Sequence, residues 1–259
     1  MVNSTTNTTT ATLQYSLPPA KGERAKYTIL TSPDPATGEY YKKNYGSEEH
    51  AVVIEDVRGK EDSVSLDTTG FQYIKHASKL TAASRVEIFD HTLRRRRPGD
   101  KEDVAGKRQP VSRVHIDQST SASIARVHRH LPAADAPKLL EKRFQIINLW
   151  RPIEHPALDW PLALCDCRSV DEKKDIFPVA RVTPDREGET LGVTYNENHK
   201  WKYLRGMTPE ELVLIKCFDS VQDGSVAVFT PHTGFEDPTT PPEAPPRRSI
   251  EIRALVFYD

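Results

Sequence analysis

Three residues of this chain have side chains that could bind one metal ion. His115 and Asp117 are separated by a single residue, and His232 lies far downstream. Two imidazoles and one carboxylate on one face of a metal ion leave three coordination positions open, which is the facial arrangement of non-heme Fe(II) oxygenases. The open positions could hold a bidentate keto acid and then dioxygen. The residue types therefore indicate oxidation chemistry at a metal centre.

The residues around His115 have the pattern of a β-strand that brings two of these ligands together. Side chains alternate between the faces of a strand, so His115 and Asp117 share one face and Ile116 points to the other. His232 follows a short apolar run, where a late strand would bring its imidazole to face the first. Two alternatives stay open, because nine histidines make chance matches easy: a hydrogen-bonded or exposed His/Asp pair, and a loop histidine packed under a proline-rich segment.

Arg247 and Ser249 form a second candidate site, on the segment that follows His232. They share one strand face, where a guanidinium can bind a carboxylate bidentately and a hydroxyl can add a third hydrogen bond. Their partner would be the far carboxylate of 2-oxoglutarate, whereas Arg248 would face the other way. Glu251 and Arg253 continue the same face, either as an internal ion pair that supports the site or as a surface pair of little consequence. The alternative is a solvated basic pair at the start of an edge strand.

A third cluster lies at Asn148–Pro152, where a polar and aromatic strand end precedes a proline. Asn148 and Trp150 share a face, and Arg151 is placed at the turn. Arg151 and Asn148 are the predicted substrate-binding residues, with Arg151 as the anchor for an acidic or carbonyl group. A core tryptophan beside a surface arginine is the alternative.

Short β-strands are the elements that must position these residues. The chain has 20 prolines, mostly between short runs of β-forming residues, which favours a sandwich or barrel. The predicted strands are Lys26–Leu30, Ala51–Glu55, Gly70–Lys75, Arg85–Leu93, Ser112–Asp117, Gln145–Trp150, Leu162–Cys165, Leu191–Tyr195, His199–Tyr203, Leu212–Phe218, Ser225–Phe229 and Ser249–Tyr258. Two helices are predicted, Ser121–His130 with Ser119 as its cap, and Ala136–Lys142.

Two long connections are candidates for the mouth of the site. Arg94–Gln109 is densely charged, and Thr233–Pro246 carries five prolines. The second connection lies between His232 and Arg247, so it should pass close to both candidate sites. We expect these two loops to line part of the substrate pocket.

Composition narrows the class of protein. A length of 259 residues suits one large β domain, predicted over residues 13–259 after a disordered tail at residues 1–12. A formal net charge of -1 gives no reason to expect nucleic acid, and no apolar run is long enough to span a bilayer. An odd number of cysteines, Cys165, Cys167 and Cys217, with no signal peptide favours a reducing cytoplasm.

As a set, several blocks of this sequence resemble the fungal hydroxylase/desaturase family of secondary-metabolite gene clusters, whose members carry gibberellin desaturase and cephalosporin methoxylase-subunit names. The blocks are Val114–Gln118, Asn148–Pro152, His199–Tyr203 with Met207, Phe218–Ser220, His232–Phe235 and Arg247–Arg253. The likeness extends from about Lys26 to Tyr258, and the combination is specific although no single block is. One departure is the short connection Lys79–Ser84, where such proteins have a longer, helical one.

The resemblance implies a mainly β, double-stranded β-helix (jelly-roll) fold with a few flanking helices. It also implies Fe(II), 2-oxoglutarate as co-substrate and ascorbate as the candidate reductant. Carried over, the iron ligands are His115, Asp117 and His232, and the 2-oxoglutarate carboxylate binds at Arg247 beside Ser249.

We therefore predict a 2-oxoglutarate-dependent dioxygenase that hydroxylates, desaturates or oxidatively cyclises a small secondary-metabolite intermediate. Its partner is a small-molecule substrate, with no nucleic acid or membrane, and a homodimer is the candidate assembly. Two rival functions keep the jelly roll, a metal-dependent isomerase and a catalytically silent partner subunit. A third rival is a non-enzymatic β-sandwich interaction module.

Overall fold

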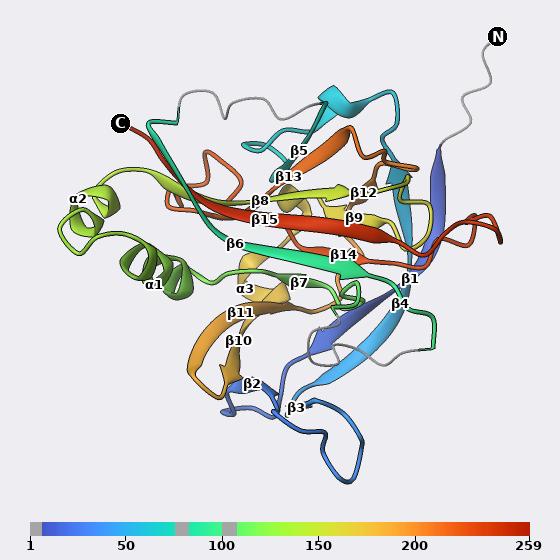
Figure 1. Cartoon of the computed structure of the whole chain (residues 1–259), viewed down its shortest axis with the longest axis horizontal. Coiled ribbons are helices and arrows are strands. Elements are labelled where there is room, and N and C mark those ends of the chain that lie inside the picture. Colours follow the sequence, from blue (N-terminus) through green and yellow to red (C-terminus); the bar gives the residue numbers. More distant parts are fainter. Residues whose placement is uncertain (1–6, 76–82, 100–107) are drawn as a thin grey trace.

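The computed structural model describes residues 7–75, 83–99 and 108–259, and its chain folds into two β-sheets with the helices α1 (Thr120–His130) and α2 (Ala136–Leu140) at one end (Figure 1). The ten-stranded sheet consists, in spatial order, of β1 (Thr8–Leu17), β4 (Gly46–Asp56), β12 (Trp201–Tyr203), β9 (Leu162–Cys165), β14 (His232–Gly234), β7 (His115–Ile116), β11 (Arg186–Val193), β10 (Ile176–Thr183), β2 (Ala25–Ile29) and β3 (Tyr41–Lys43). The five-stranded sheet consists of β5 (Phe71–Lys75), β13 (Glu211–Asp219), β8 (Phe144–Pro152), β15 (Arg248–Phe257) and β6 (Arg85–Arg95).

The helices are short. They are α1 (Thr120–His130), α2 (Ala136–Leu140), α3 (Glu172–Asp175) and two 3-10 turns, η1 (Glu61–Ser63) and η2 (Cys167–Ser169). None of the helices in the described part of the chain has the length and apolar character needed to cross a membrane. The predicted fold, a mainly β jelly roll with a few flanking helices, is confirmed.

The core lies between the sheets, and the strand sequences reflect how each strand is covered. All nine residues of β13 are buried, which explains its almost continuous apolar run. Side chains of β8, β13 and β15 pack with Leu164 of β9 and with Leu204 and Val57, which directly follow β12 and β4 of the facing sheet. At one end of the five-stranded sheet, Val127 of α1 and Ala136 of α2 pack on Phe144 and Phe257. Helix α1 therefore closes the end of the barrel beside β7.

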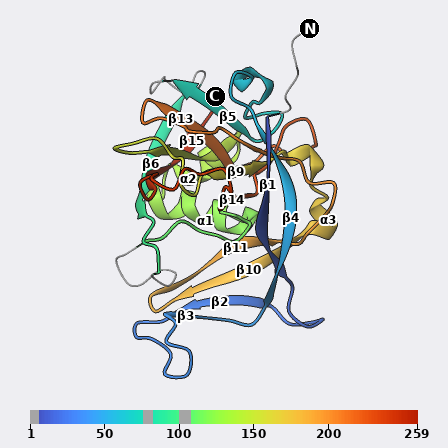
Figure 2. The ribbon, with the colours of Figure 1, turned by 90° about the vertical axis from the view of Figure 1, so that its right-hand side faces the viewer.

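Beyond β7, the ten-stranded sheet continues through β11, β10, β2 and β3, away from the five-stranded sheet (Figure 2). The hairpin of β10 and β11 pairs over eight residues, from Ile176 with Val193 to Thr183 with Arg186. Helix α1 contacts β11. The hairpin and α1 thus form two walls around the end of β7.

Several predicted elements differ in the structure. Residues 8–12 are not tail, because β1 begins at Thr8 and pairs with β4 along its whole length. Its threonines are β-branched and fit a strand despite their polarity, whereas residues 1–6 lie outside the described residues. Residues 225–229 form no strand. The strand predicted to end at Asp117 is reduced to His115–Ile116. Most of the hairpin of β10 and β11 was not predicted.

Two other predictions concern residues that are described only in part. The short connection Lys79–Ser84 falls mostly on residues 76–82, and the charged loop Arg94–Gln109 includes residues 100–107. Both of these ranges lie outside the described residues. The described ends of the charged loop, Arg94 and Arg108, line a cavity considered below.

The cap predicted for α1 is confirmed, and it gives a first testable expectation. The Ser119 hydroxyl accepts a hydrogen bond from the backbone N–H of Ala122. Ser119→Ala should therefore lower the free energy of unfolding by about 1 kcal/mol, because one partly buried N–H donor at the start of the helix loses its acceptor. Urea unfolding followed by circular dichroism measures the change. Ser121→Ala, at an exposed position of the same helix, should cost less, and equal costs would contradict the capping role.

Candidate functional site

His115 and His232 are brought together by strand pairing. β7 and β14 are antiparallel neighbours, and His115 is directly opposite His232 in the register. Directly opposed residues have side chains on the same face of a sheet, and the centroids of the two rings are 4.4 Å apart. Asp117 follows β7, with its Oδ1 atom 3.5 Å from His115 Nε2 and 3.9 Å from His232 Nε2. One ligand atom from each of the three residues lies within 4.8 Å of the others.

Backbone carbonyls fix the orientation of both imidazoles. His115 Nδ1 lies 2.8 Å from the carbonyl oxygen of Arg113, and His232 Nδ1 lies 3.0 Å from that of Thr230. A carbonyl oxygen only accepts, so each Nδ1 carries the hydrogen and donates it. Each Nε2 then has a free lone pair, directed toward Asp117. Holding one ring nitrogen so that the other can bind a metal is a common feature of histidine metal ligands.

The ionisation states also suit metal binding. Burial, with the neighbouring charge of His115, lowers the pKa of His232 to about 4, so this imidazole is neutral at neutral pH. Burial alone would raise the pKa of Asp117, but the positive charge of Arg253 and the interactions with His115 and His232 together outweigh it and hold that pKa well below its ordinary value. A neutral imidazole and an ionised carboxylate are the forms that ligate metals.

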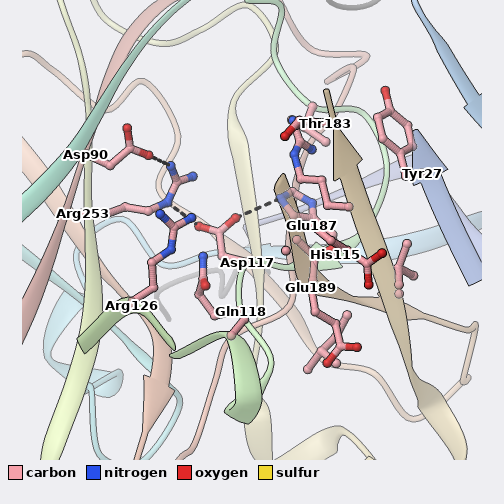
Figure 3. Close-up of a pocket in the computed structure, with 18 of the residues that line it drawn as sticks. Tyr27, Asp90, His115, Asp117, Gln118, Arg126, Thr183, Glu187, Glu189 and Arg253 are labelled. Carbon is pink, nitrogen blue, oxygen red and sulfur yellow. Dashed lines mark hydrogen bonds and ion pairs between the residues drawn. The ribbon is translucent and has the colours of Figure 1, made fainter. Parts of the chain in front are cut away.

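One oxygen of the Asp117 carboxylate, Oδ2, accepts all the protein hydrogen bonds described here. Arg253 Nε donates to Asp117 Oδ2 at 2.9 Å, and Asn148 Nδ2 and Cys217 Sγ each lie 3.4 Å from the same oxygen. Oδ1 is left facing the two histidines. Figure 3 shows Asp117 between Arg253 on one side and His115 on the other. The arrangement provides one carboxylate oxygen and two imidazole nitrogens on one side of a small space.

Arg253 belongs to an internal chain of charges along β15. It donates to Asp90 and to Glu251, each at 2.9 Å, and Glu251 accepts from Arg94 at 2.6 Å. Glu251 and Arg94 are buried. Of the two interpretations of Glu251 and Arg253, the internal pair is therefore correct. Removing one member would leave an uncompensated buried charge, so the network fixes the position of Asp117.

Arg247 and Ser249 have the geometry of a carboxylate-binding site. Both side chains are buried, and Arg248 on the opposite face pairs with Glu154, as the strand phase predicts. Arg247 Nη1 donates to the carbonyl of Trp160, and the guanidinium lies 5.4 Å from the centroid of the Trp150 ring. Burial, together with the charge of Arg94, lowers the pKa of Arg247 to about 9, so it is positive at neutral pH.

Several buried polar atoms around Arg247 have no hydrogen-bond partner within the described residues. They are Arg247 Nε, Ser249 Oγ and Trp150 Nε1. Buried donors without acceptors are rare in folded proteins and call for an explanation. Gly234 lies beside this group, because an added Cβ there would be 3.3 Å from Arg247 Nη1. An acidic ligand would satisfy the donors, so the residues fit the far carboxylate of 2-oxoglutarate.

The prediction for Arg151 needs correction. Asn148 and Trp150 face Asp117 and Arg247, but Arg151 is exposed and its Nη1 donates to the carbonyl of Pro209 at 3.4 Å. Strand alternation places it on the opposite face from Asn148. The apparent turn before Pro152 does not interrupt β8, which continues through Pro152. Arg151 is therefore a surface arginine, while Asn148 reaches the site through its contact with Asp117.

A cavity of about 700 Å³ opens beside the His/Asp/His cluster. Its walls are β6, α1 and the hairpin of β10 and β11, and His115 and Asp117 line it. Thr233–Pro246 contributes no lining residue, so that part of the loop prediction is wrong; Asp237 of this loop is instead bonded to Thr9 and Tyr203. Sequence reasoning missed the hairpin and the α1 residues Arg126 and Arg129. The only sequence signal for these arginines was their place on the capped helix just after Asp117.

Comparisons with known proteins agree with this geometry. A family model described as "Oxidoreductase/YMDC permease-like domain" matches residues 13–82 and 76–257. The hydroxylase/desaturase asaB of Aspergillus flavus is 33% identical over 80% of this chain and 80% of its own length. The Fe(II)/2-oxoglutarate-dependent dioxygenase nvfI of Aspergillus novofumigatus is 29% identical over 88% of this chain and 95% of its own.

Solved structures show the same likeness in three dimensions. The structure of an iron and alpha-ketoglutarate-dependent endoperoxidase, NvfI, superposes with a TM-score of 0.83 and 27% sequence identity. The superposition covers 97% of this chain and 98% of the other. The match therefore includes both sheets and the strands that bear the His/Asp/His cluster.

Proposed function

The chain belongs to the family of fungal Fe(II)/2-oxoglutarate-dependent hydroxylases and desaturases, and we propose that its His115, Asp117 and His232 bind the iron. The protein is thus an oxygenase of secondary metabolism. The observation that carries the assignment is the orientation of the three ligands. Both Nε2 atoms and Asp117 Oδ1 face one another, while their other polar atoms are occupied by protein partners.

Arg247 and Ser249 are the proposed binding site for 2-oxoglutarate. A guanidinium with a free Nε and a buried hydroxyl offers converging donors to one carboxylate. When bound, Fe(II) and 2-oxoglutarate supply an oxidation by dioxygen in which the keto acid becomes succinate and carbon dioxide and the substrate loses hydrogen or gains a hydroxyl group.

The protein's own residues determine where that chemistry acts. Arg253 and Asn148 fix the ligating carboxylate, and the carbonyls of Arg113 and Thr230 fix the imidazoles. The cavity beside His115 and Asp117 would hold the substrate carbon near the metal, which is how positioning contributes to catalysis. The position of that carbon should decide between hydroxylation, desaturation and oxidative cyclisation.

The experiment that tests this function measures succinate. The protein is loaded with Fe(II) without oxygen, supplied with 2-oxoglutarate and ascorbate, and then exposed to oxygen with candidate intermediates of its gene cluster. Succinate should form only when Fe(II), 2-oxoglutarate and oxygen are all present, and a true substrate should increase its rate. Stoichiometric Fe(II) binding without succinate would instead indicate a catalytically silent subunit or an isomerase.

We also propose a cytoplasmic location and a homodimer. Cys165, Cys167 and Cys217 are all free thiols, which suits a reducing compartment. The homodimer stays a prediction that sedimentation of the purified protein measures directly. The small-molecule substrate is supported by the size of the cavity, which falls in the range of small-ligand sites.

A further inference from the structure

The cavity beside the proposed iron site carries an excess of positive charge. Its described lining residues include nine arginines but four acidic residues. A concave site with one sign of charge attracts ligands of the opposite sign. An anionic ligand would bind at those arginines that have no carboxylate partner within the described residues.

Several of these arginines already have carboxylate partners. Arg253 pairs with Asp117, Asp90 and Glu251, and Arg94 also pairs with Glu251. At the hairpin, Arg24 pairs with Glu187 and Glu189. The four acidic lining residues are thus each engaged with Arg253 or Arg24, and none of them forms a described ion pair with Arg126, Arg129 or Arg186.

Arg126 is different, because it is partly buried in the cavity wall without a carboxylate partner within the described ranges. It extends from α1 and lines the same cavity as Arg253 and Asp117, and the charge of Arg253 acts on it; Figure 3 shows the three side chains in one view. One face of the guanidinium lies over the Phe89 ring, 5.2 Å from its centroid. Arg129 and Arg186 also line the cavity and are likewise without a described ion pair. Burial, followed by the charges of Arg186 and Arg129, lowers the pKa of Arg126.

A positive group in this position is destabilised by its surroundings, and an anion would relieve both the burial and the repulsion. The flat guanidinium can offer parallel N–H donors to a carboxylate. We propose that Arg126, supported by Arg129 and Arg186, binds an ionised carboxylate or an equally acidic oxygen of the substrate. This inference rests on the proposed function, because it assigns the substrate class of the same active site.

The anion at Arg126 is distinct from 2-oxoglutarate bound at Arg247. Arg126 lines the same cavity as Arg253, whereas Arg247 immediately precedes β15 and is six residues from Arg253, roughly 20 Å of extended chain. Arg247 also does not line the described cavity. The two guanidiniums therefore serve different carboxylates, one on each side of the proposed metal site. A substrate acid held at Arg126 would present the rest of its carbon skeleton to Asp117 and His115.

The test compares a matched pair of probes, 2-naphthoate and its neutral amide 2-naphthamide. Binding is measured by equilibrium dialysis with anaerobic, Fe(II)-loaded protein and saturating 2-oxoglutarate, so that the Arg247 site is filled. The wild-type protein should bind the acid at least about 10-fold more tightly than the amide, because a charged hydrogen-bond pair is gained. Arg126→Gln should lose that preference without changing the affinity for the amide or the KM for 2-oxoglutarate.

Two further variants show whether the lost preference for the acid is caused by the Arg126 side chain itself. Arg126→Lys keeps the charge and should recover part of the preference for the acid, which shows that the loss in Arg126→Gln is not misfolding. Arg151→Gln, on the outer face of the sheet, should bind both probes like the wild type. Equal binding of acid and amide by the wild-type protein, or an unchanged preference in Arg126→Gln, would overturn the proposal.

The experiments distinguish a failure of the anion site at Arg126 from a failure of the proposed oxygenase function. Absence of Fe(II) binding or of succinate formation would contradict the oxygenase assignment. In that case dialysis of the two naphthalene probes against the metal-free protein would still measure whether acid binding depends on Arg126. Conversely, full turnover of 2-oxoglutarate with no role for Arg126 would leave the oxygenase and remove the anion site.

Discussion

His232→Ala should abolish Fe(II) binding and 2-oxoglutarate turnover while the fold survives. His232 Nε2 is one of three ligand atoms, and the remaining His115 and Asp117 would hold a divalent ion through only two protein groups. Apart from the His115 ring and Asp117, the side chain has one described interaction, the hydrogen bond to the carbonyl of Thr230, so its removal should disturb little outside the cluster. Iron content after anaerobic loading and succinate formation measure the two effects.

His232 is a cleaner position for this test than Asp117. Removing the Asp117 carboxylate would leave Arg253 with an uncompensated charge, and the protein could unfold for that reason alone. His155→Ala is a suitable control, because His155 is a partly exposed histidine outside the cluster, with its Nδ1 near the carbonyl of Pro156. It should retain full iron and full activity. Stoichiometric iron and normal turnover in His232→Ala would remove this residue from the metal site.

Arg247→Ala should raise the KM for 2-oxoglutarate strongly. The guanidinium is buried and its Nε has no partner within the part of the chain that the structure describes. Loss of a buried, charged contact to a carboxylate costs about 2–5 kcal/mol, roughly 30-fold to several thousand-fold in affinity. Succinate formation at increasing 2-oxoglutarate concentration measures the change. Fe(II) binding without 2-oxoglutarate should remain intact, since Arg247 contacts none of the three proposed ligands.

The neighbouring residue provides the matched control. Arg248 points away from the cluster and pairs with Glu154 at the surface, so Arg248→Ala should leave the KM unchanged. Arg247→Lys keeps a positive charge without the planar fork and should give an intermediate KM. A sensitive Arg248 with a silent Arg247 would mean that the carboxylate is bound on the opposite strand face.

Local strand geometry allowed much of the candidate site to be predicted. Side chains alternate with a period of two in any strand, so the shared face of Arg247, Ser249, Glu251 and Arg253 follows from the sequence once the strand is recognised. The same argument placed His115 and Asp117 together, and it holds although β7 is only two residues long. The Ser119 cap of α1 was also predictable, because its hydrogen bond is made within the first turn of the helix.

The period-two alternation of strand side chains also argues against the prediction that Arg151 binds substrate. Arg151 is one residue out of phase with Trp150, but the following proline suggested a turn rather than a continuing strand. In the structure, Pro152 is the last residue of β8 and pairs with Ser249. The strand therefore continues, and Arg151 leaves it on the outer face.

The sequence by itself determined the ligand types, the phase of their strands and, through the family resemblance, the jelly roll. Only the tertiary structure decided that His232 lies opposite His115, because that pairing joins segments far apart in the chain. It also decided that α1 and the hairpin of β10 and β11 enclose a cavity where Arg126 lacks a described counter-charge. Periodicity is a local property of the backbone, whereas pairing partners and the balance of charges around a cavity depend on which distant segments pack together.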